Sequence, residues 1–127
     1  MKLIAPLNSS TIFIGDNVGM SNCTLFAYKS IIIEDNVMIG GGVNIWDTDF
    51  HPMYGSPRSS SSEDLTNVSI SPVVIKKNVF IGALSIILKG VTIGENSIIG
   101  AGSVVTQTIP ANVIAAGNPC QVIKSIN

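Results

Sequence analysis

The chain has 127 residues, of which 46% are hydrophobic and 12% are charged, and its net charge is −1. This length accommodates one domain spanning residues 1–127, and the scattered lysines leave no basic stripe that could follow a nucleic-acid backbone. No apolar run approaches the roughly 18 residues that cross a bilayer, so we expect neither nucleic-acid binding nor membrane insertion.

The N-terminal stretch MKLIAPLNSS carries one lysine and a short apolar patch that ends at Pro6, which is too little for a secretory signal. Cys23 and Cys120 match no metal-ligand or redox spacing. Two free thiols in a chain without an export signal predict the reducing cytoplasm.

Aliphatic residues recur every six positions through most of the chain. An early run begins its units at Ile14, Met20, Phe26, Ile33, Ile39 and Ile45, and a later run begins them at Ile75, Ile81, Ile87, Ile93, Ile99 and Val105. The fifth residue of one unit and the first of the next lie two positions apart, so they share one face of an extended chain. Each unit therefore predicts a short strand with two inward residues, followed by a corner where glycine is favoured.

Four asparagines mark the same corner of successive coils. They are Asn17, Asn36, Asn78 and Asn96, each in the fourth position of its unit. Asparagine is the usual non-glycine residue in left-handed backbone, and three units of six make one coil. We therefore predict a stacked asparagine column on an all-β solenoid of about four coils. Ordinary turn asparagines of a β-sandwich would not keep this fixed phase.

The spacing between the second and third of these asparagines leaves a long excursion beyond one coil. Its polar, proline- and serine-containing sequence predicts a protruding loop over about residues 47–70, and such loops are usually functional or disordered. The stretch NIWDTDFHP at its start holds the chain's only tryptophan and only histidine. Residues 110–127, after the last regular unit, predict a C-terminal tail.

His51 is the candidate for acid–base chemistry because imidazole accepts and releases protons near neutral pH. In an extended chain Asp47, Asp49 and His51 would project to one side, where a carboxylate could orient the imidazole, bind an acceptor's hydroxyls or cap the turn. Residues two apart on one strand lie roughly 6–7 Å apart, which is a poor hydrogen-bonding distance. A purely structural hydrogen bond is the alternative role for His51.

Two further residues are outward-facing by their position in the repeat. Asn44 and Phe80 are both sixth in their units, between inward neighbours. Trp46 lies at a corner, where its ring could stack on a sugar or pack against a neighbouring subunit. We predict a substrate-binding set made of Asn44, Trp46, Asp47 and Asp49.

At this point the sequence resembles the hexapeptide-repeat acyltransferases, and most of all their maltose, galactoside and sugar O-acetyltransferase branch. The segments that carry the resemblance are DTDFHP, NVFIGALSIILKGVTIG, IIGAGSVVTQTIP and VIAAGNPCQVIK, and the match covers nearly the whole chain. The resemblance implies a left-handed parallel β-helix, a homotrimer and acetyl-CoA bound in the cleft between two neighbouring subunits, with no metal. It also implies that His51 is the catalytic base.

The same resemblance assigns cofactor-binding residues. Phe80 matches an aromatic that lines the cofactor cleft, and the backbone at Ala83 and Ala101 matches contacts to the pantetheine arm. Farther along the cofactor the matching positions are Thr106, Gln107 and Lys124. Gln107, and Gln121 after it, stand where the family commonly has a basic residue. The helical N-terminal segment of the maltose and galactoside enzymes has no counterpart in this chain, so the identity of the acceptor does not transfer.

These observations predict an acetyl-CoA-dependent O-acetyltransferase that acts on a hydroxyl of a sugar or glycan precursor. Two alternatives stay open: an N-acetyltransferase acting on an amino sugar or xenobiotic, and a non-catalytic trimeric β-helix module. A zinc-dependent carbonic anhydrase on the same kind of solenoid would need three histidines, and the chain has one. Outward apolar residues would gain from burial in a trimer, and they include Trp46, Phe80, Ile86 and Ile98.

Overall fold

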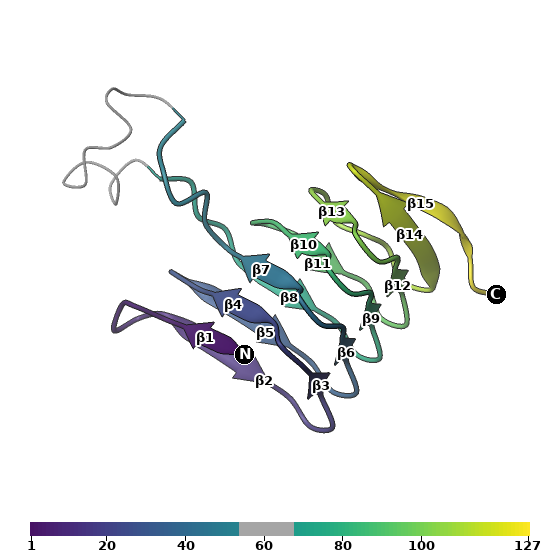
Figure 1. The fold of residues 1–127 in the computed structure, drawn as a ribbon, viewed down its shortest axis with the longest axis horizontal. Coiled ribbons are helices and arrows are strands. Elements are labelled where there is room, and N and C mark those ends of the chain that lie inside the picture. The colour runs from purple at the N-terminus through teal and green to yellow at the C-terminus, as the bar shows by residue number, and fades with distance from the viewer. Residues whose placement is uncertain (54–67) are drawn as a thin grey trace.

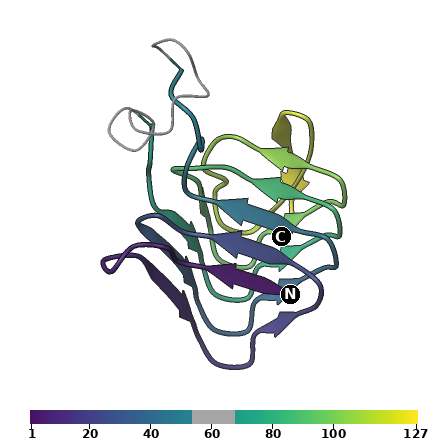
Figure 2. The ribbon, with the colours of Figure 1, turned by 60° about the vertical axis from the view of Figure 1, so that its left-hand side comes forward.

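The computed structural model describes residues 1–53 and 68–127, which form a parallel β-solenoid. Successive coils contribute short strands to three sheets in turn, and the sheets form three sides of the solenoid (Figure 1, Figure 2). The last coil meets sheet B only through an isolated bridge between Ile93 and Ile109. No helix occurs in either of these ranges. The all-β solenoid predicted from the six-residue period is confirmed.

The chain visits sheets A, B and C in turn. Sheet A contains β1 (Lys2–Ile4), β4 (Thr24–Phe26), β7 (Asn44–Trp46), β10 (Ile86–Ile87) and β13 (Val104–Val105). Sheet B contains β2 (Thr11–Ile14), β5 (Ser30–Ile33), β8 (Val73–Ile75) and β11 (Thr92–Ile93). Sheet C contains β3 (Gly19–Met20), β6 (Met38–Ile39), β9 (Phe80–Ile81), β12 (Ile98–Ile99), β14 (Val113–Gly117) and β15 (Cys120–Ser125). We call the three columns of turns between them corners A/B, B/C and C/A.

The core consists of columns of inward aliphatic side chains, one from each coil. On sheet B, Ile33 pairs with Ile75 and Ile75 with Ile93, and all three are fully buried. Burying each such side chain stabilises the fold by roughly 1.5–3 kcal/mol. Three inward serines are also buried, and each hydroxyl donates to a backbone carbonyl of the same or the next coil, so their burial leaves no polar group unpaired: they are Ser85, Ser97 and Ser103.

The predicted asparagine column occupies corner B/C. All four predicted members have positive φ, between 58° and 66°. Asn112 extends the column with φ of 61°. The amide of Asn78 donates to Asn96 at 3.0 Å, and the amide of Asn96 donates to Asn112 at 2.8 Å. The prediction of a stacked column is therefore confirmed, with one more member than expected.

The solenoid has about five coils rather than the four predicted. Sheet A contains five strands, one for each coil. The end coils depart from the regular period: Lys2 pairs with Thr24, a spacing of more than three units of six, and Asn96 bonds Asn112 across only 16 residues. Counting regular units along the sequence passes over these two coils because their turns differ in length.

Glycines are required where adjacent coils approach most closely. A Cβ atom on Gly82 would lie 2.5 Å from the backbone nitrogen of Ala101 in the next coil, which is too close for a rigid backbone neighbour. Gly102, by contrast, has open space around it and is required only for its φ of 71°. Both glycines lie at corner C/A, so this corner combines the two reasons for glycine in one place.

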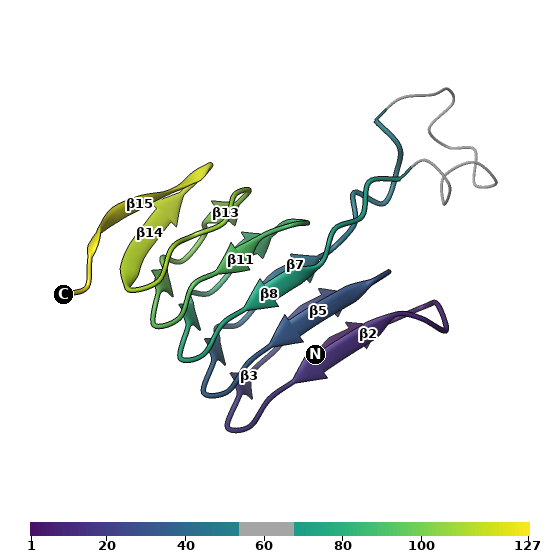
Figure 3. The ribbon, with the colours of Figure 1, turned by 180° about the vertical axis from the view of Figure 1, so that it is seen from behind.

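The segment between β7 and β8, which we call the arm, leaves the solenoid at corner A/B of the third coil. Strand β7 ends at Trp46 and β8 begins at Val73, and the predicted loop, about residues 47–70, falls between them. The arm joins β7 to β8 (Figure 3). Register resumes after the arm without a shift, since Asn44 pairs with Ile86 and Met38 with Phe80. The serine run of the predicted loop lies outside the described residues.

The segment predicted as a C-terminal tail forms strands. Its β14 continues sheet C, and β15 folds back on β14 as the one antiparallel pair of strands in the described chain. None of the described elements is a helix long and apolar enough to cross a bilayer.

Candidate active site

The arm departs through a neck at Thr48 and Ile70, which pair in an antiparallel bridge. The N–H of Ser71 donates to the carbonyl of Asp47 at 2.9 Å, which closes the neck on the solenoid side. His51 follows three residues after Thr48 and is exposed. The only histidine of the chain therefore lies close to the neck, which is hydrogen-bonded to the solenoid.

Asp47 has a structural role rather than the predicted substrate-binding one. Its side chain is fully buried. One carboxylate oxygen accepts from the N–H of Tyr28 at 2.8 Å, and the other accepts from Lys29 at 2.7 Å and Ser30 at 2.9 Å. These bonds occupy both oxygens and cap the corresponding turn of the preceding coil. Of the roles considered from the sequence, turn capping is the one observed.

Asp49 lies on the exposed side of the neck. Its carboxylate pairs with the Lys89 ammonium at 3.1 Å, which joins the arm to the next coil. The prediction that Asp47, Asp49 and His51 project together assumed extended backbone. Phe50 has φ of 65°, so the chain bends between Asp49 and His51 and the assumption fails. Asp49 remains accessible, whereas Asp47 does not.

Four aromatic rings gather beside the neck. The Phe50 ring contacts Phe26 and Trp46 edge-to-face, with centroids 4.9 Å and 5.5 Å away. Phe26 also contacts Tyr28, at 5.2 Å. The predicted substrate residue Trp46 therefore packs against its own arm. Phe26 and Phe50 were not predicted from the sequence. Phe50 could have been noticed as the aromatic residue directly before His51. Phe26 lies one coil earlier, in register with Trp46.

The residues assigned to the cofactor lie mostly on sheet C and the turns that follow it. Phe80 and Met38 are neighbours on the outer surface of this sheet, 47% and 53% exposed. Beside them is a hollow of about 330 Å³ lined by Gly19, Met20, Ser21, Met38, Ile39, Gly40 and Phe80. Ala83 and Ala101 are exposed at corner C/A, on successive coils. Gly40 lines the hollow and lies against the backbone of Ala83, so the hollow borders corner C/A.

The remaining predicted residues are divided between the other sides. Thr106 and Gln107 follow β13 at corner A/B and are exposed. Lys124 lies on β15, opposite Ile114 of β14, and is exposed. Asn44 faces outward from sheet A, half-buried, between Thr24 and Ile86 of the adjacent strands.

The structure thus sorts the candidates into two groups. The corner group, at corner A/B, contains His51, Asp49, Thr106 and Gln107. The sheet C group, on sheet C and corner C/A, contains Phe80, Ala83, Ala101 and Lys124. In a three-sided solenoid the corner between two sheets lies opposite the third sheet. Within one protomer, the corner group therefore lies across the solenoid from Phe80 and Lys124, the members of the other group that stand on sheet C.

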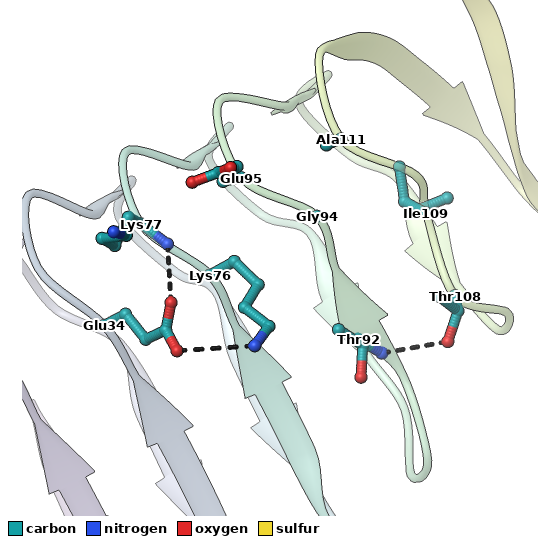
Figure 4. A pocket seen from close by; sticks show the side chains of 9 residues that line it. All are labelled: Glu34, Lys76, Lys77, Thr92, Gly94, Glu95, Thr108, Ile109 and Ala111. Atoms are coloured by element: carbon teal, nitrogen blue, oxygen red, sulfur yellow. Dashed lines mark hydrogen bonds and ion pairs between the residues drawn. The ribbon is translucent and has the colours of Figure 1, made fainter.

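A second depression, of about 490 Å³, lies on sheet B and corner B/C (Figure 4). Glu34 pairs with the Lys76 ammonium at 3.6 Å and accepts from the backbone N–H of Lys77 at 3.1 Å. The N–H of Thr92 donates to the Thr108 hydroxyl at 3.2 Å. Its polar groups largely satisfy one another, and none of the predicted site residues lines it.

The two cysteines are free thiols, and both are buried. Burial raises the pKa of Cys23 and of Cys120, and a hydrogen bond with Ser103 opposes that rise at Cys120. A thiol with a raised pKa is a poor nucleophile near neutral pH. Within residues 1–53 and 68–127, no three His, Cys, Asp or Glu side chains gather closely enough to hold a metal ion.

Comparison with known proteins identifies relatives for most of the chain. Residues 72–107 match the family model described as bacterial transferase hexapeptide (six repeats). A galactoside O-acetyltransferase of Escherichia coli (strain K12) is 43% identical over 119 residues, which are 93% of this chain and 56% of that relative. The chain therefore spans little more than half the length of this curated relative.

Solved structures agree with the sequence matches. A galactoside acetyltransferase in complex with coenzyme A superposes with a TM-score of 0.82 and 40% identity, over 99% of this chain and 60% of that one. A maltose O-acetyltransferase from Clostridium difficile 630 gives a TM-score of 0.77 and 36% identity, over 100% of this chain and 67% of that one. The chain belongs to the hexapeptide-repeat acetyltransferase family.

Proposed function

We propose that the protein transfers an acetyl group from acetyl-CoA to a hydroxyl of a sugar or glycan precursor, in a cleft between two protomers of a homotrimer. The observation that carries the proposal is the 43% identity to a galactoside O-acetyltransferase over 93% of this chain. The coenzyme A bound in a structure that matches 99% of the chain supports the choice of donor. The two buried free thiols support a cytoplasmic setting.

In the proposed reaction His51 acts as a general base. It takes the proton of the acceptor hydroxyl while that oxygen attacks the thioester carbonyl carbon. A backbone N–H at the cleft stabilises the oxyanion of the tetrahedral intermediate. Collapse of the intermediate breaks the carbon–sulfur bond, and the proton held by the imidazole passes to the departing CoA sulfur. The products are the acetyl ester and free CoA.

The separation of the two groups supports an intersubunit site. The corner group carries the proposed base, whereas the sheet C group carries four of the six residues matched to the donor. Two of these four, Phe80 and Lys124, stand on sheet C, across the protomer from the base. Cyclic threefold symmetry would place the corner group of each protomer against sheet C of the next and would close the ring. Met38 and Phe80, about half exposed, would then be buried against a neighbour.

On the donor side, the exposed backbone at Ala83 and Ala101 would bind the pantetheine arm, with Phe80 as a wall of the cleft. Thr106, Gln107 and Lys124 would contact the donor farther along. Exposed hydroxyl and amide groups at the first two of these positions can hydrogen-bond phosphate or ribose, and Lys124 adds the positive charge.

On the acceptor side, Asp49 and Asn44 are the polar candidates. The Asp49 carboxylate keeps acceptor capacity beyond its pair with Lys89, so it can bind a sugar hydroxyl. Trp46 is half-buried and offers an apolar contact. An amine of an amino sugar would serve the same base equally well, and Asp49 would attract a protonated amine, so N-acetylation is the second candidate activity.

Thiol release from acetyl-CoA tests the proposal, with methyl β-galactoside, maltose and glucosamine as acceptors and mass spectrometry of the products. We expect acetylation by the wild type, and a fall of kcat by roughly 10²–10⁴-fold in His51→Ala with CoA affinity retained. A wild type that neither binds CoA in calorimetry nor acetylates any acceptor would instead be the non-catalytic module. A His51→Ala variant with full activity would remove the general base.

A further inference from the structure

Phe50, which directly precedes His51, has an unusual backbone conformation. Its φ of 65° lies in the left-handed region, where a bulky non-glycine residue is an outlier. Such a conformation persists only where the surrounding structure over-determines it, and it concentrates at functional sites. The contacts of Phe50 therefore need an account that reaches beyond the residue itself.

Three contacts hold Phe50 in place. Its ring packs edge-to-face on Phe26 of β4, with an interplanar angle of 67°, and on Trp46 of β7, with an angle of 77°. Its N–H donates to the Thr48 hydroxyl at 3.0 Å, and Thr48 is 2% exposed. Two strands of the solenoid and the buried neck thus act together on one residue of the arm.

The bend at Phe50 also determines where the next residue lies. The N–H of His51 donates to the carbonyl of Asp49 at 2.7 Å, a bond that spans the bend. A change of φ at Phe50 would break this bond and swing the backbone of His51 away from the neck. The position of the imidazole is therefore coupled to the ring contacts of Phe50.

We infer that Phe50 is a positioning residue: its ring, held by Phe26 and Trp46, maintains the bend that sets His51 in the intersubunit cleft. The inference rests on the proposed role of His51 as base. A catalytic group must stand close to its reacting atom, and a misplacement of about 1 Å costs on the order of a hundredfold in rate. Ring packing that merely stabilised the fold would have no such effect on the rate of the folded enzyme.

The kinetic test compares Phe50→Gly with Phe50→Tyr. Glycine accepts the left-handed φ without steric cost but loses the ring, so the bend becomes one of many accessible conformations. We expect kcat to fall by roughly ten- to a hundredfold with the KM for acetyl-CoA unchanged. Tyrosine keeps the ring and should keep kcat within about twofold of the wild type. Phe13→Ala, an exposed aromatic on sheet B, is the matched control and should leave both constants unchanged.

Combining the changes identifies the route of the effect. In a His51→Ala background, Phe50→Gly should cause no further loss, because there is no imidazole left to position. A further loss of tenfold in that background would overturn the inference, and so would a wild-type kcat in Phe50→Gly. Full activity in His51→Ala would instead refute the general base while the kinetic effect of Phe50→Gly remained measurable, so the two failures are distinguishable.

A second readout needs no acceptor. His51 is the only histidine, so histidine labelled at the ring carbon gives one NMR signal per protomer. We expect ¹³C relaxation to show an ordered imidazole in the wild type and in Phe50→Tyr, and a mobile one in Phe50→Gly. Phe26→Leu, which loosens the clamp from another strand, should also raise the mobility of the imidazole. Equal order in all four proteins would overturn the inference.

Discussion

The carboxylate of Asp47 and the backbone N–H of Lys29 lie 2.7 Å apart and join the start of the arm to the turn between β4 and β5. The N–H groups of Tyr28 and Ser30 donate to the same carboxylate. The arm therefore begins with an aspartate whose side chain caps a turn of the preceding coil. The first residue after β7 belongs to the scaffold, and the proposed base, His51, follows four residues later.

Replacing this carboxylate should destabilise the fold. Asp47→Asn removes the charge and one acceptor oxygen beneath three backbone donors, so we expect a loss of about 1.5–3 kcal/mol in the free energy of unfolding. Guanidinium denaturation monitored by circular dichroism measures it. Asp49→Asn is the control, because its exposed pair with Lys89 should contribute less than about 1 kcal/mol. Equal stability of the two variants would contradict the capping role.

The asparagine column makes a separate prediction about backbone strain. Asn96 has φ of 66° and bonds both neighbours in the column. Asn96→Ala should cost about 1–2 kcal/mol, since alanine tolerates left-handed backbone poorly. Asn96→Gly keeps the backbone and loses only exposed hydrogen bonds, so it should cost less than Asn96→Ala in the same denaturation assay. The reverse order would show that the side-chain ladder, not the backbone, holds the corner.

Two glycines at corner C/A should respond differently to alanine. Gly82→Ala places a methyl group against the backbone of the next coil and should cost roughly 3 kcal/mol. Gly102→Ala meets open space and should cost only about 1 kcal/mol through its φ. Thermal unfolding of the two variants decides the comparison. Similar melting temperatures would mean that the coils can separate at this corner more easily than the contact distances indicate.

Mixing two inactive variants tests whether the proposed site lies between protomers. His51→Ala lacks the base, and Ala83→Trp should block the donor strip on sheet C. Random co-assembly in a closed ring should leave about a quarter of the sites with both native groups, so activity should reappear after the variants are unfolded and refolded together. A site within one protomer would stay inactive in every mixture, because each chain carries one lesion. Refolding each variant alone gives the baseline.

The two thiols should be unreactive in the folded protein. Burial raises the pKa of Cys23 and Cys120, so less thiolate is present at any pH below the raised values. Ellman's reagent at pH 7.5 should titrate both thiols only after guanidinium is added. Rapid reaction of the native protein would show that the solenoid opens at one end. Slow native reaction would also keep the background low in assays that detect CoA with this reagent.

The interior of the solenoid could be predicted from the sequence because its cause is local. Hydrophobic residues two apart and asparagines in fixed phase are visible in any list of residues, and the column at corner B/C follows from them. Asn112 was not predicted as a member of the column because its coil is shorter than eighteen residues. The first coil was not predicted because it is longer than eighteen residues: Lys2 pairs with Thr24.

The candidate site was harder to predict than the fold. His51 could be identified from its rarity, its neighbours in sequence and a family resemblance. The bend at Phe50 could not, because it depends on the contact with the Phe26 ring, which a strand of the preceding coil contributes. The burial of Asp47 was also hidden, since its donors lie 17 to 19 residues earlier in the chain. Contacts between distant residues decide both outcomes.

The arm enters and leaves at a single corner, and the ladder of strands beneath it continues unshifted from Asn44 to Ile86. The number of residues in the detour is therefore independent of the stacking on either side. An insertion or deletion there would change the arm alone, whereas one elsewhere would rotate every later position around the axis. Such a layout lets specificity diverge among descendants of one scaffold while the supporting architecture is inherited unaltered.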